Sequence, residues 1–492
     1  MGFADHLAVY AAVSLLISAF AAPLLARWKP VFSGYMVLAA LAFSFITSLV
    51  LLKYISEIGT LTYFMGGWPP PWGIELTIDP LRVYMLTTIT GVSLWIFIYA
   101  LRDLEHELKE EVICWYHSLY AILTASMAVM ALTNDLFNLF VMMEICAITA
   151  CALITIKNKK ECLEAGFNYL ILSAMGSGCF LLGVAMIYMV TGYLNFSMVQ
   201  AELSQAILLY PLNIYTAAAL FIVAFGTKAA LFPLHVWLPD AHASAPSPSS
   251  AMLSGLVIKI YAFVLFLIFS RVFPQSLLDA IPLRQIILWL GAAGVMFGSI
   301  YAMLQSDLKK MLAYSSIGQI AFIFMGIGIN HSLAVTGGLY HIMVHAVTKA
   351  LLFMAAGAVI YSTGVRRISD LTGIGKLLPL PMLAFTIGSA SMIGLPGTGG
   401  LISKWYLALG SLENGQIFFL LIILASSLLN AVYYMPIVIS AFMKEEEIRF
   451  EFRKIPFSMQ LTMILGMIMV LASGIISRPI IQLIEQAVIN LY

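Results

Sequence analysis

Long apolar segments alternate with short polar ones along almost the whole chain. Because about 20 residues of helix cross the hydrocarbon core of a bilayer, runs of about 18 or more apolar residues predict transmembrane helices. Fourteen are predicted, near 4–26, 31–53, 80–101, 112–133, 135–156, 162–190, 207–232, 244–270, 283–304, 309–330, 333–362, 379–409, 415–442 and 457–478.

The composition agrees with this pattern. Of 492 residues, 62% are hydrophobic and 10% are charged, whereas a soluble chain averages about 25% charged residues. The sequence therefore predicts an all-α polytopic membrane protein surrounded by lipid. The net charge of +1, without a long basic run, argues against nucleic acid as a partner.

Lysine and arginine are unevenly divided between the two sides of the predicted bundle. With the N-terminus outside, sixteen of the 25 lie on the inner side, four on the outer side and five within spans. Because basic loops resist translocation, we expect a multi-pass protein of the plasma membrane with both termini outside.

A weak internal repeat occurs at an offset of 172 residues. Asp135-Leu136 returns as Asp307-Leu308, and Thr191-Gly192 returns as Thr363-Gly364. Five spans separate the copies, so the copies would have opposite orientations, as in inverted-repeat transporters. Chance similarity between apolar segments is the alternative.

The cysteines do not suggest a metal or cofactor site. Cys114, Cys146, Cys151, Cys162 and Cys179 lie within apolar runs and form no Cys-x-x-Cys pair, so we interpret them as packing residues and predict no metal and no cofactor.

One acid and four bases are predicted deep inside spans, namely Glu144, Lys228, Lys259, Lys349 and Lys404. A charged side chain at mid-bilayer costs about 2.5 to 3.5 kcal/mol on insertion scales, so each needs a function or a partner. Lysines that reach the interface, or static ion pairs, are the alternative explanation.

Two of these lysines lie beside helix-breaking sequences. FPLHVWLPDAH follows Lys228 at 232–242, and GLPGTGG precedes Lys404 at 394–400. Proline removes a backbone donor, and the freed groups must meet protein or water. Interrupted helices in both halves indicate a polar transport path.

The eleventh span carries His341, His345 and Lys349 at steps of four residues. This spacing places them on one helix face, which is typical of a proton relay, although separate packing histidines would give the same pattern. A glutamate and a lysine about 4 Å apart attract by roughly 4 kcal/mol at an effective dielectric constant of about 20. A pair of Glu144 with Lys228 would therefore control the charge of the lysine.

At these residues the chain resembles the antiporter-like subunits of respiratory complex I. Glu144, GTKAALFPLHVWLPDAH at 226–242, PSPSSAMLSG at 246–255, Lys259 and Lys404 carry the resemblance. The family includes the D subunit of Mrp-type sodium/proton antiporters and subunits of membrane-bound hydrogenases.

The resemblance implies fourteen helices, with helices 7 and 12 broken and two inverted five-helix repeats. The implied divisions are N-terminal helices 1–3 at 1–110, the first repeat at 111–270, the second repeat at 271–442, and helix 14 with a short tail at 443–492. It also implies a central polar axis through Glu144, Lys228, Lys259 and Lys404, and a connecting role for His341, His345 and Lys349. Some members carry glutamate at the position of Lys404 or histidine at that of Lys259, so the branch stays open.

We therefore expect a proton-translocating subunit that works with other membrane subunits and is driven by them. Whether sodium is a second ion stays open. Membership of an enzyme complex also stays open, because the sequence shows no redox site of its own. The alternatives are a stand-alone solute carrier and a non-conducting scaffold subunit.

Overall fold

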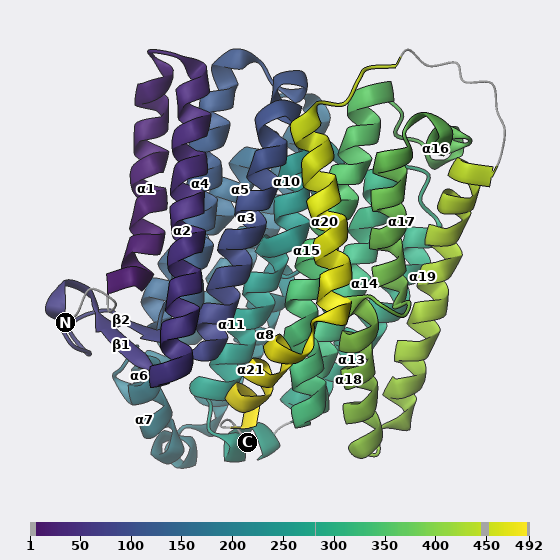
Figure 1. Cartoon of the computed structure of the whole chain (residues 1–492). Coiled ribbons are helices and arrows are strands. Elements are labelled where there is room, and N and C mark those ends of the chain that lie inside the picture. The colour runs from purple at the N-terminus through teal and green to yellow at the C-terminus, as the bar shows by residue number, and fades with distance from the viewer. Residues whose placement is uncertain (1–5, 281, 444–451, 490–492) are drawn as a thin grey trace.

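The long helices stand side by side as one bundle in the computed structural model, which describes residues 6–280, 282–443 and 452–489 (Figure 1). Up to the middle of the chain the helices are α1 (Leu7–Ala26), α2 (Pro30–Ile58), α3 (Pro80–Glu107), α4 (Glu110–Leu132), α5 (Leu136–Thr155), α6 (Lys160–Thr191), α7 (Phe196–Leu209), α8 (Pro211–Lys228), α9 (Leu238–Ser244), α10 (Ser247–Met252) and α11 (Ile258–Arg271). They continue with α12 (Gln275–Ala280), α13 (Leu283–Met303), α14 (Leu308–Ile329), α15 (Ser332–Thr363), α16 (Ile374–Leu377), α17 (Pro379–Ile393), α18 (Gly399–Glu413), α19 (Ile417–Met443), α20 (Phe457–Ile475) and α21 (Arg478–Ile489).

Twelve helices in the described ranges are long and apolar enough to cross a membrane, which confirms an all-α polytopic membrane protein. The other two predicted spans, the seventh and the twelfth, are interrupted as expected. The seventh stops at the end of α8, and the twelfth is divided between α17 and α18. A total of fourteen crossings stays a prediction.

Several short elements were not predicted. The connection after α2 contains an antiparallel hairpin of β1 (Leu61–Phe64) and β2 (Glu75–Ile78). The amphipathic α7 precedes α8, so the predicted start of the seventh span at residue 207 is wrong. The short tail, for which no form was predicted, contains α21, whose apolar face packs against α15 and α3.

The helix ends repeat at the offset seen in the sequence. Asp135 accepts a hydrogen bond from the backbone N–H three residues ahead, as Asp307 does, which caps α5 and α14. Gly192 and Gly364 end α6 and α15 in the left-handed conformation, as glycine permits. Both of these helices have 32 residues.

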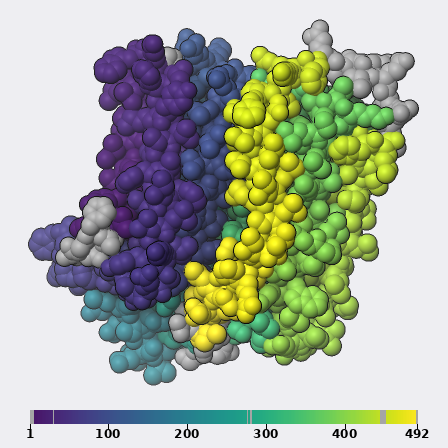
Figure 2. Space-filling view, in the orientation of Figure 1, coloured from purple at the N-terminus to yellow at the C-terminus, as the bar shows by residue number. Residues whose placement is uncertain are grey.

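The core helices are α11, α14 and α15, which are buried along nearly their whole length. Their apolar side chains and their few polar ones are covered by other helices on nearly all sides. The helices α1, α2, α6, α19 and α20 are more exposed and lie around them. In the space-filling view α20 and α21, in yellow, cross one face between the first helices and the later ones (Figure 2). The lysines and histidines of the sequence prediction therefore lie on the most deeply buried helices or next to them.

The start of α1 and the end of α20 lie at the same end of the bundle (Figure 1). An even number of crossings requires this arrangement.

Candidate functional site

An ion pair joins α5 to the end of α8. The carboxylate Oε1 of Glu144 lies 3.5 Å from Nζ of Lys228. Ser177 on α6 donates a hydrogen bond to the same carboxylate, and Lys228 donates to the hydroxyl of Ser173 at 2.9 Å. Two serines one helical turn apart thus hold the two charged groups, and the pair that the sequence suggested is formed.

The lysine has a favourable position because α8 ends there. A cation at a helix C-terminus interacts favourably with the helix dipole, and Lys228 is the last residue of α8. Beyond it the chain turns through residues 229–237 before α9 begins. The indole N–H of Trp237 donates to the carbonyl of Thr227 at 2.9 Å, so a carbonyl near the break is satisfied inside the protein, as lipid surroundings require.

The two members of the pair differ in exposure. The side chain of Lys228 is 1% exposed and that of Glu144 is 33% exposed. The ammonium is therefore enclosed by this chain, whereas the carboxylate lies at the edge of the bundle.

Lys259 lies in the core next to a turn of π-helix. Its ammonium donates to the carbonyl of Ser254 within η3 (Leu253–Val257), the π-helical turn that joins α10 to α11. The hydroxyl of Ser254 lies 2.7 Å from that of Ser316 on α14. Such π-turns leave backbone groups free for other partners and are frequent at functional sites.

On α15 the two histidines lie along one face and Lys349 continues it. The rings of His341 and His345 stack at 5.5 Å between centroids. His341 Nδ1 is 2.8 Å from the hydroxyl of Ser403 on α18, and Lys349 donates to the carbonyl of Leu312 at 2.9 Å. The sequence prediction of one helix face is consistent with this arrangement.

Lys404 lies after the second helix break and points back to it. Its ammonium donates to the carbonyls of Met392 and Ile393, at 2.8 and 3.2 Å, and to the hydroxyl of Ser427 at 3.1 Å. These carbonyls end α17. Lys228 ends a helix at a break, and Lys404 reaches the end of the helix before its break, so both cations lie near a helix C-terminus.

Direct contacts join only some of the seven predicted residues. Glu144 pairs with Lys228, and the rings of His341 and His345 stack. Both ring nitrogens of His345 lack a hydrogen-bond partner among the described residues. No hydrogen bond among the described residues joins Lys228 to Lys259, although the Tyr261 ring lies 5.6 Å from the Lys228 ammonium. Proton transfer between these two lysines needs a water molecule or a side-chain movement.

The sequence interpretation missed a buried acidic group at the end of α3. That helix continues six residues beyond the predicted 101, so Asp103 is buried at 1% exposure. Glu107 pairs with Lys157 and accepts hydrogen bonds from the backbone N–H and the hydroxyl of Ser247. The signal was two carboxylates four residues apart, which the predicted helix end placed in a loop. Asp103 is thus a more deeply buried carboxylate than Glu144, which is 33% exposed.

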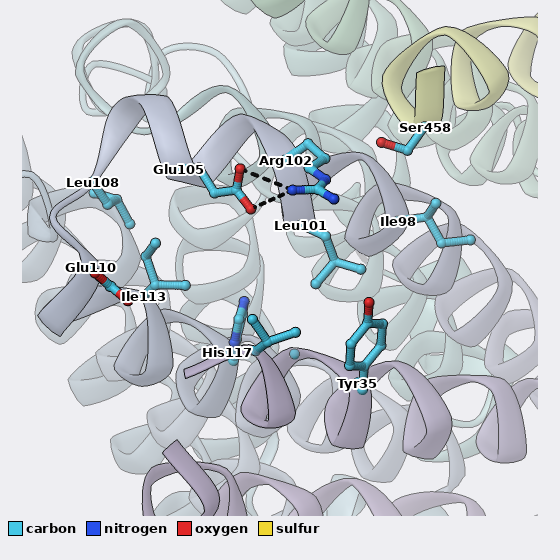
Figure 3. A pocket seen from close by; sticks show the side chains of 12 residues that line it. Tyr35, Ile98, Leu101, Arg102, Glu105, Leu108, Glu110, Ile113, His117 and Ser458 are labelled. Carbon is cyan, nitrogen blue, oxygen red and sulfur yellow. Dashed lines mark hydrogen bonds and ion pairs between the residues drawn. The ribbon is translucent and has the colours of Figure 1, made fainter. Parts of the chain in front are cut away.

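A cavity of about 560 Å³ lies apart from these residues, between α2, α3 and α4 (Figure 3). Apolar side chains line it together with the ion pair of Arg102 and Glu105. His117 also lines it, and its Nδ1 is 2.9 Å from the hydroxyl of Ser33. None of the seven predicted residues lines this cavity, so it is not part of the candidate path.

Comparison with known proteins identifies the family. Residues 133–430 match the family described as NADH:quinone oxidoreductase/Mrp antiporter, TM. The chain is 40% identical over 444 residues to NADH-quinone oxidoreductase subunit N of Desulforudis audaxviator (strain MP104C), covering 89% of this chain and 87% of that protein. It is 32% identical over 460 residues to the provisionally named antiporter subunit mnhD2 of Staphylococcus aureus (strain JH9), covering 92% and 90%.

Solved structures show the same fold. A chain of the archaeal membrane-bound sulfane sulfur reductase, a respiratory membrane complex, matches with a TM-score of 0.91 at 29% identity, covering 98% of this chain and 97% of that one. A chain of the Mrp complex from Dietzia sp. DQ12-45-1b matches with a TM-score of 0.90 at 23% identity, covering 100% and 98%. These neighbours belong to assemblies of several membrane subunits. Because the family match spans residues 133–430 and the two relatives align with 89% and 92% of the chain, this chain belongs to the NADH:quinone oxidoreductase/Mrp antiporter family of membrane subunits.

Proposed function

We propose that this chain is the proton-translocating subunit of a multisubunit membrane complex. The observation that carries the proposal is the pair of Glu144 with the buried Lys228 at a helix break inside the membrane. Protons would enter towards Lys228, pass Lys259 and the side chains of His341, His345 and Lys349, and leave through Lys404. Partner subunits would supply the driving force.

The ion pair has the energy to act as a switch. Two unit charges 3.5 Å apart attract by about 5 kcal/mol at an effective dielectric constant of about 20, and the partial exposure of Glu144 reduces this value. While the pair is closed, the ammonium of Lys228 is stabilised. When the carboxylate moves away, the buried ammonium loses this support and becomes a proton donor to the next site.

The exposed position of the carboxylate supports control from outside the chain. Glu144 lies at the edge of the bundle while Lys228 is enclosed. A neighbouring subunit can therefore move the carboxylate away from the lysine without opening the path around the lysine. This is how redox chemistry or a cation gradient elsewhere in the complex would reach the proton path.

We also propose two inverted repeats, at 111–270 and 271–442, between N-terminal helices at 1–110 and a C-terminal part at 443–492. Support comes from features that recur at the offset of 172 residues. Leu136 N–H bonds to the carbonyl of Leu194, and Leu308 N–H bonds to that of Arg366, both at 2.9 Å. The equal lengths of α6 and α15 are a second such feature.

The proposed setting is the plasma membrane, with both termini outside and with other membrane subunits as partners. The relatives include a subunit of an NADH-quinone oxidoreductase and a subunit of an antiporter. The proposed transported ion is the proton, because lysine and histidine side chains bind and release it, and sodium is a second ion to be tested.

Proton flux in inverted native-membrane vesicles tests the proposal. Vesicles with the assembled complex receive NADH or an imposed sodium gradient, and a pH-sensitive dye reports proton movement. We expect Lys228→Met to lower the flux at least about 10-fold. The matched control is Lys53→Met, at an exposed position, which should stay within about twofold.

Each other outcome counts against the proposal. Unchanged flux in Lys228→Met would remove it. Loss of assembly without an effect on flux per complex would favour a scaffold subunit. Purification as a self-sufficient homo-oligomer that moves a small solute would favour a stand-alone carrier.

A further inference from the structure

Four buried side chains that no sequence motif singled out lie between Lys349 and Lys404. They are Tyr434, Tyr433 and Asn430 on α19 and Ser315 on α14. The exposure of each is 6% or less. Buried polar groups are costly unless they are hydrogen-bonded, so each of these four side chains needs a partner.

The contacts form one continuous hydrogen-bond chain. Lys349 Nζ is 3.3 Å from the hydroxyl of Tyr434, which is 2.9 Å from that of Ser315. The hydroxyl of Tyr433 is 2.9 Å from that of Ser315 and 2.7 Å from Oδ1 of Asn430.

The last link ends at a helix break. Nδ2 of Asn430 donates to the carbonyl of Met392 at 3.0 Å, and the ammonium of Lys404 donates to the same carbonyl at 2.8 Å. The amide and the ammonium therefore share one acceptor at the end of α17. This series of hydrogen bonds begins at Lys349 and ends at the carbonyl of Met392, which also accepts from Lys404.

We propose that Tyr434, Ser315, Tyr433 and Asn430 are positioning residues whose hydrogen-bond direction couples the charge of Lys349 to that of Lys404. The inference rests on the proposed function, because it assumes that both lysines change charge during transport.

With Lys349 protonated, the chain has one direction. An ammonium only donates, so Tyr434 accepts from it and donates to Ser315. Ser315 then donates to Tyr433, and Tyr433 donates to Asn430. Donation to its oxygen polarises the amide of Asn430, which strengthens its bond to Met392 and weakens the support of that carbonyl for Lys404.

With Lys349 neutral, the direction reverses. The amine lone pair accepts from Tyr434, Ser315 donates to Tyr434, and Tyr433 donates to Ser315. Oδ1 of Asn430 then loses the hydrogen bond from Tyr433. Its remaining donor is the hydroxyl of Ser299, at 3.4 Å. The carbonyl of Met392 becomes more available to the ammonium of Lys404. One lysine is thus favoured in the charged state when the other is neutral, without a proton passing through the asparagine.

The test uses phenylalanine variants that remove one hydroxyl each. Proton flux per assembled complex is measured, in the vesicles described above, for Tyr433→Phe, Tyr434→Phe and the double variant. Each single variant should lower the flux by about 3- to 10-fold, the effect of one buried hydrogen bond. The double variant should be no slower than the slower single variant, because a chain that is already broken cannot be broken again.

A matched control separates this effect from packing. Tyr120 is also buried, and its hydroxyl donates to the carbonyl of Ser93 at 2.7 Å, outside the chain. Tyr120→Phe should leave the flux within about twofold. If a tyrosine variant fails to assemble, Ser315→Ala removes the middle hydroxyl with a smaller side-chain change, and its flux decides in the same way.

Three results distinguish the hypotheses. Flux in Tyr433→Phe and Tyr434→Phe that equals the wild-type value, or single effects that multiply in the double variant, would overturn the coupling alone. Full flux in Lys228→Met would overturn the proposed function whatever the tyrosine variants do. Loss of flux in Lys228→Met together with non-additive tyrosine effects would support both.

Discussion

The carboxylate of Glu144 lies 3.5 Å from the ammonium of Lys228, and only the ammonium is fully enclosed by the chain. The acid comes from the middle of α5 and the base from the broken end of α8. An asymmetric pair of this kind keeps the proton-carrying group away from lipid while its partner stays within reach of neighbouring molecules. Its consequences are open to measurement.

Removing the negative charge of Glu144 should strongly slow transport. Glu144→Gln keeps the shape of the side chain and loses the attraction to Lys228, so we expect proton flux to fall at least about 10-fold with assembly intact. The control is Glu105→Gln, whose carboxylate is 56% exposed in a pair with Arg102. Equal flux in the two variants would contradict a role for the pair of Glu144 with Lys228.

Removing the serine that holds Lys228 should have a smaller effect. Ser173→Ala deletes the hydroxyl that accepts from the ammonium at 2.9 Å, so we expect a loss of about 3- to 10-fold in flux. Ser270→Ala is the control, because that hydroxyl donates only to carbonyls of its own helix. The prediction is wrong if Ser173→Ala costs as much as Glu144→Gln.

Arg82 should be essential for stability. Its buried guanidinium donates to the carbonyls of Leu132 and Thr133, at 3.0 and 2.6 Å, and lies 3.4 Å from a carboxylate oxygen of Asp79. Arg82→Met leaves these acceptors without a donor and should destabilise the fold by about 3 kcal/mol. We expect the lower end of the range for broken buried pairs because Asp79 keeps Arg271 nearby, at 3.7 Å.

Thermal unfolding of the purified complex measures this effect. The midpoint temperature of Arg82→Met should be clearly below that of Arg102→Met, which removes an arginine that is 57% exposed and should change stability by less than about 0.5 kcal/mol. Similar midpoints would show that the buried contacts of Arg82 contribute little.

The closest packing of α13 on α14 should tolerate no added methyl group. A Cβ on Gly298 would lie 2.5 Å from the backbone nitrogen of Gly318, and small residues are what allows helices in membranes to approach so closely. Gly298→Ala should destabilise by about 1 to 3 kcal/mol. Gly178→Ala, where a Cβ meets nothing within 4 Å, should be neutral or stabilising in the same unfolding assay. A harmless Gly298→Ala would mean that the two helices separate readily.

The two matching helix caps should respond differently to loss of charge. Burial raises the pKa of Asp135, so the folded protein binds this proton more tightly than the unfolded chain, and stability falls as pH rises through that raised pKa. Asp135→Asn keeps the cap and removes this loss, so its unfolding midpoint at neutral pH should equal or exceed that of the wild type.

Asp307 is the matched position with the opposite expectation. Its carboxylate lies 3.0 Å from the guanidinium of Arg366, so Asp307→Asn removes an ion pair and should lower the midpoint slightly. A lower midpoint for Asp135→Asn than for Asp307→Asn would contradict the role of burial at Asp135.

Local patterns were enough for much of this protein because the bilayer restricts what a chain can do. Twelve of the predicted spans appear as long helices, since apolar runs of this length satisfy their backbone only as helices in lipid. The interruptions after Lys228 and before Lys404 were equally visible, because proline and glycine act on the backbone where they stand. The cost of burying charge singled out Glu144 and the four lysines.

Contacts between distant segments could not be predicted in this way. Asp103 was assigned to a loop because helix ends are set by tertiary contacts rather than by hydropathy alone. Tyr433, Tyr434 and Asn430 resemble ordinary packing residues in sequence, and only the approach of α19 to α14 and α17 makes them partners.

The sequence by itself determined the membrane class, the positions of most spans, the two helix breaks and the set of charged residues that need partners, because these depend on hydropathy and local backbone chemistry. Only the tertiary structure decided which partner each charge has. It placed Ser173 and Glu144 around Lys228 and the end of α17 around Lys404. The physical reason is that a hydrogen bond or an ion pair depends on distances of about 3 Å, and helix packing sets those distances between residues far apart in the chain.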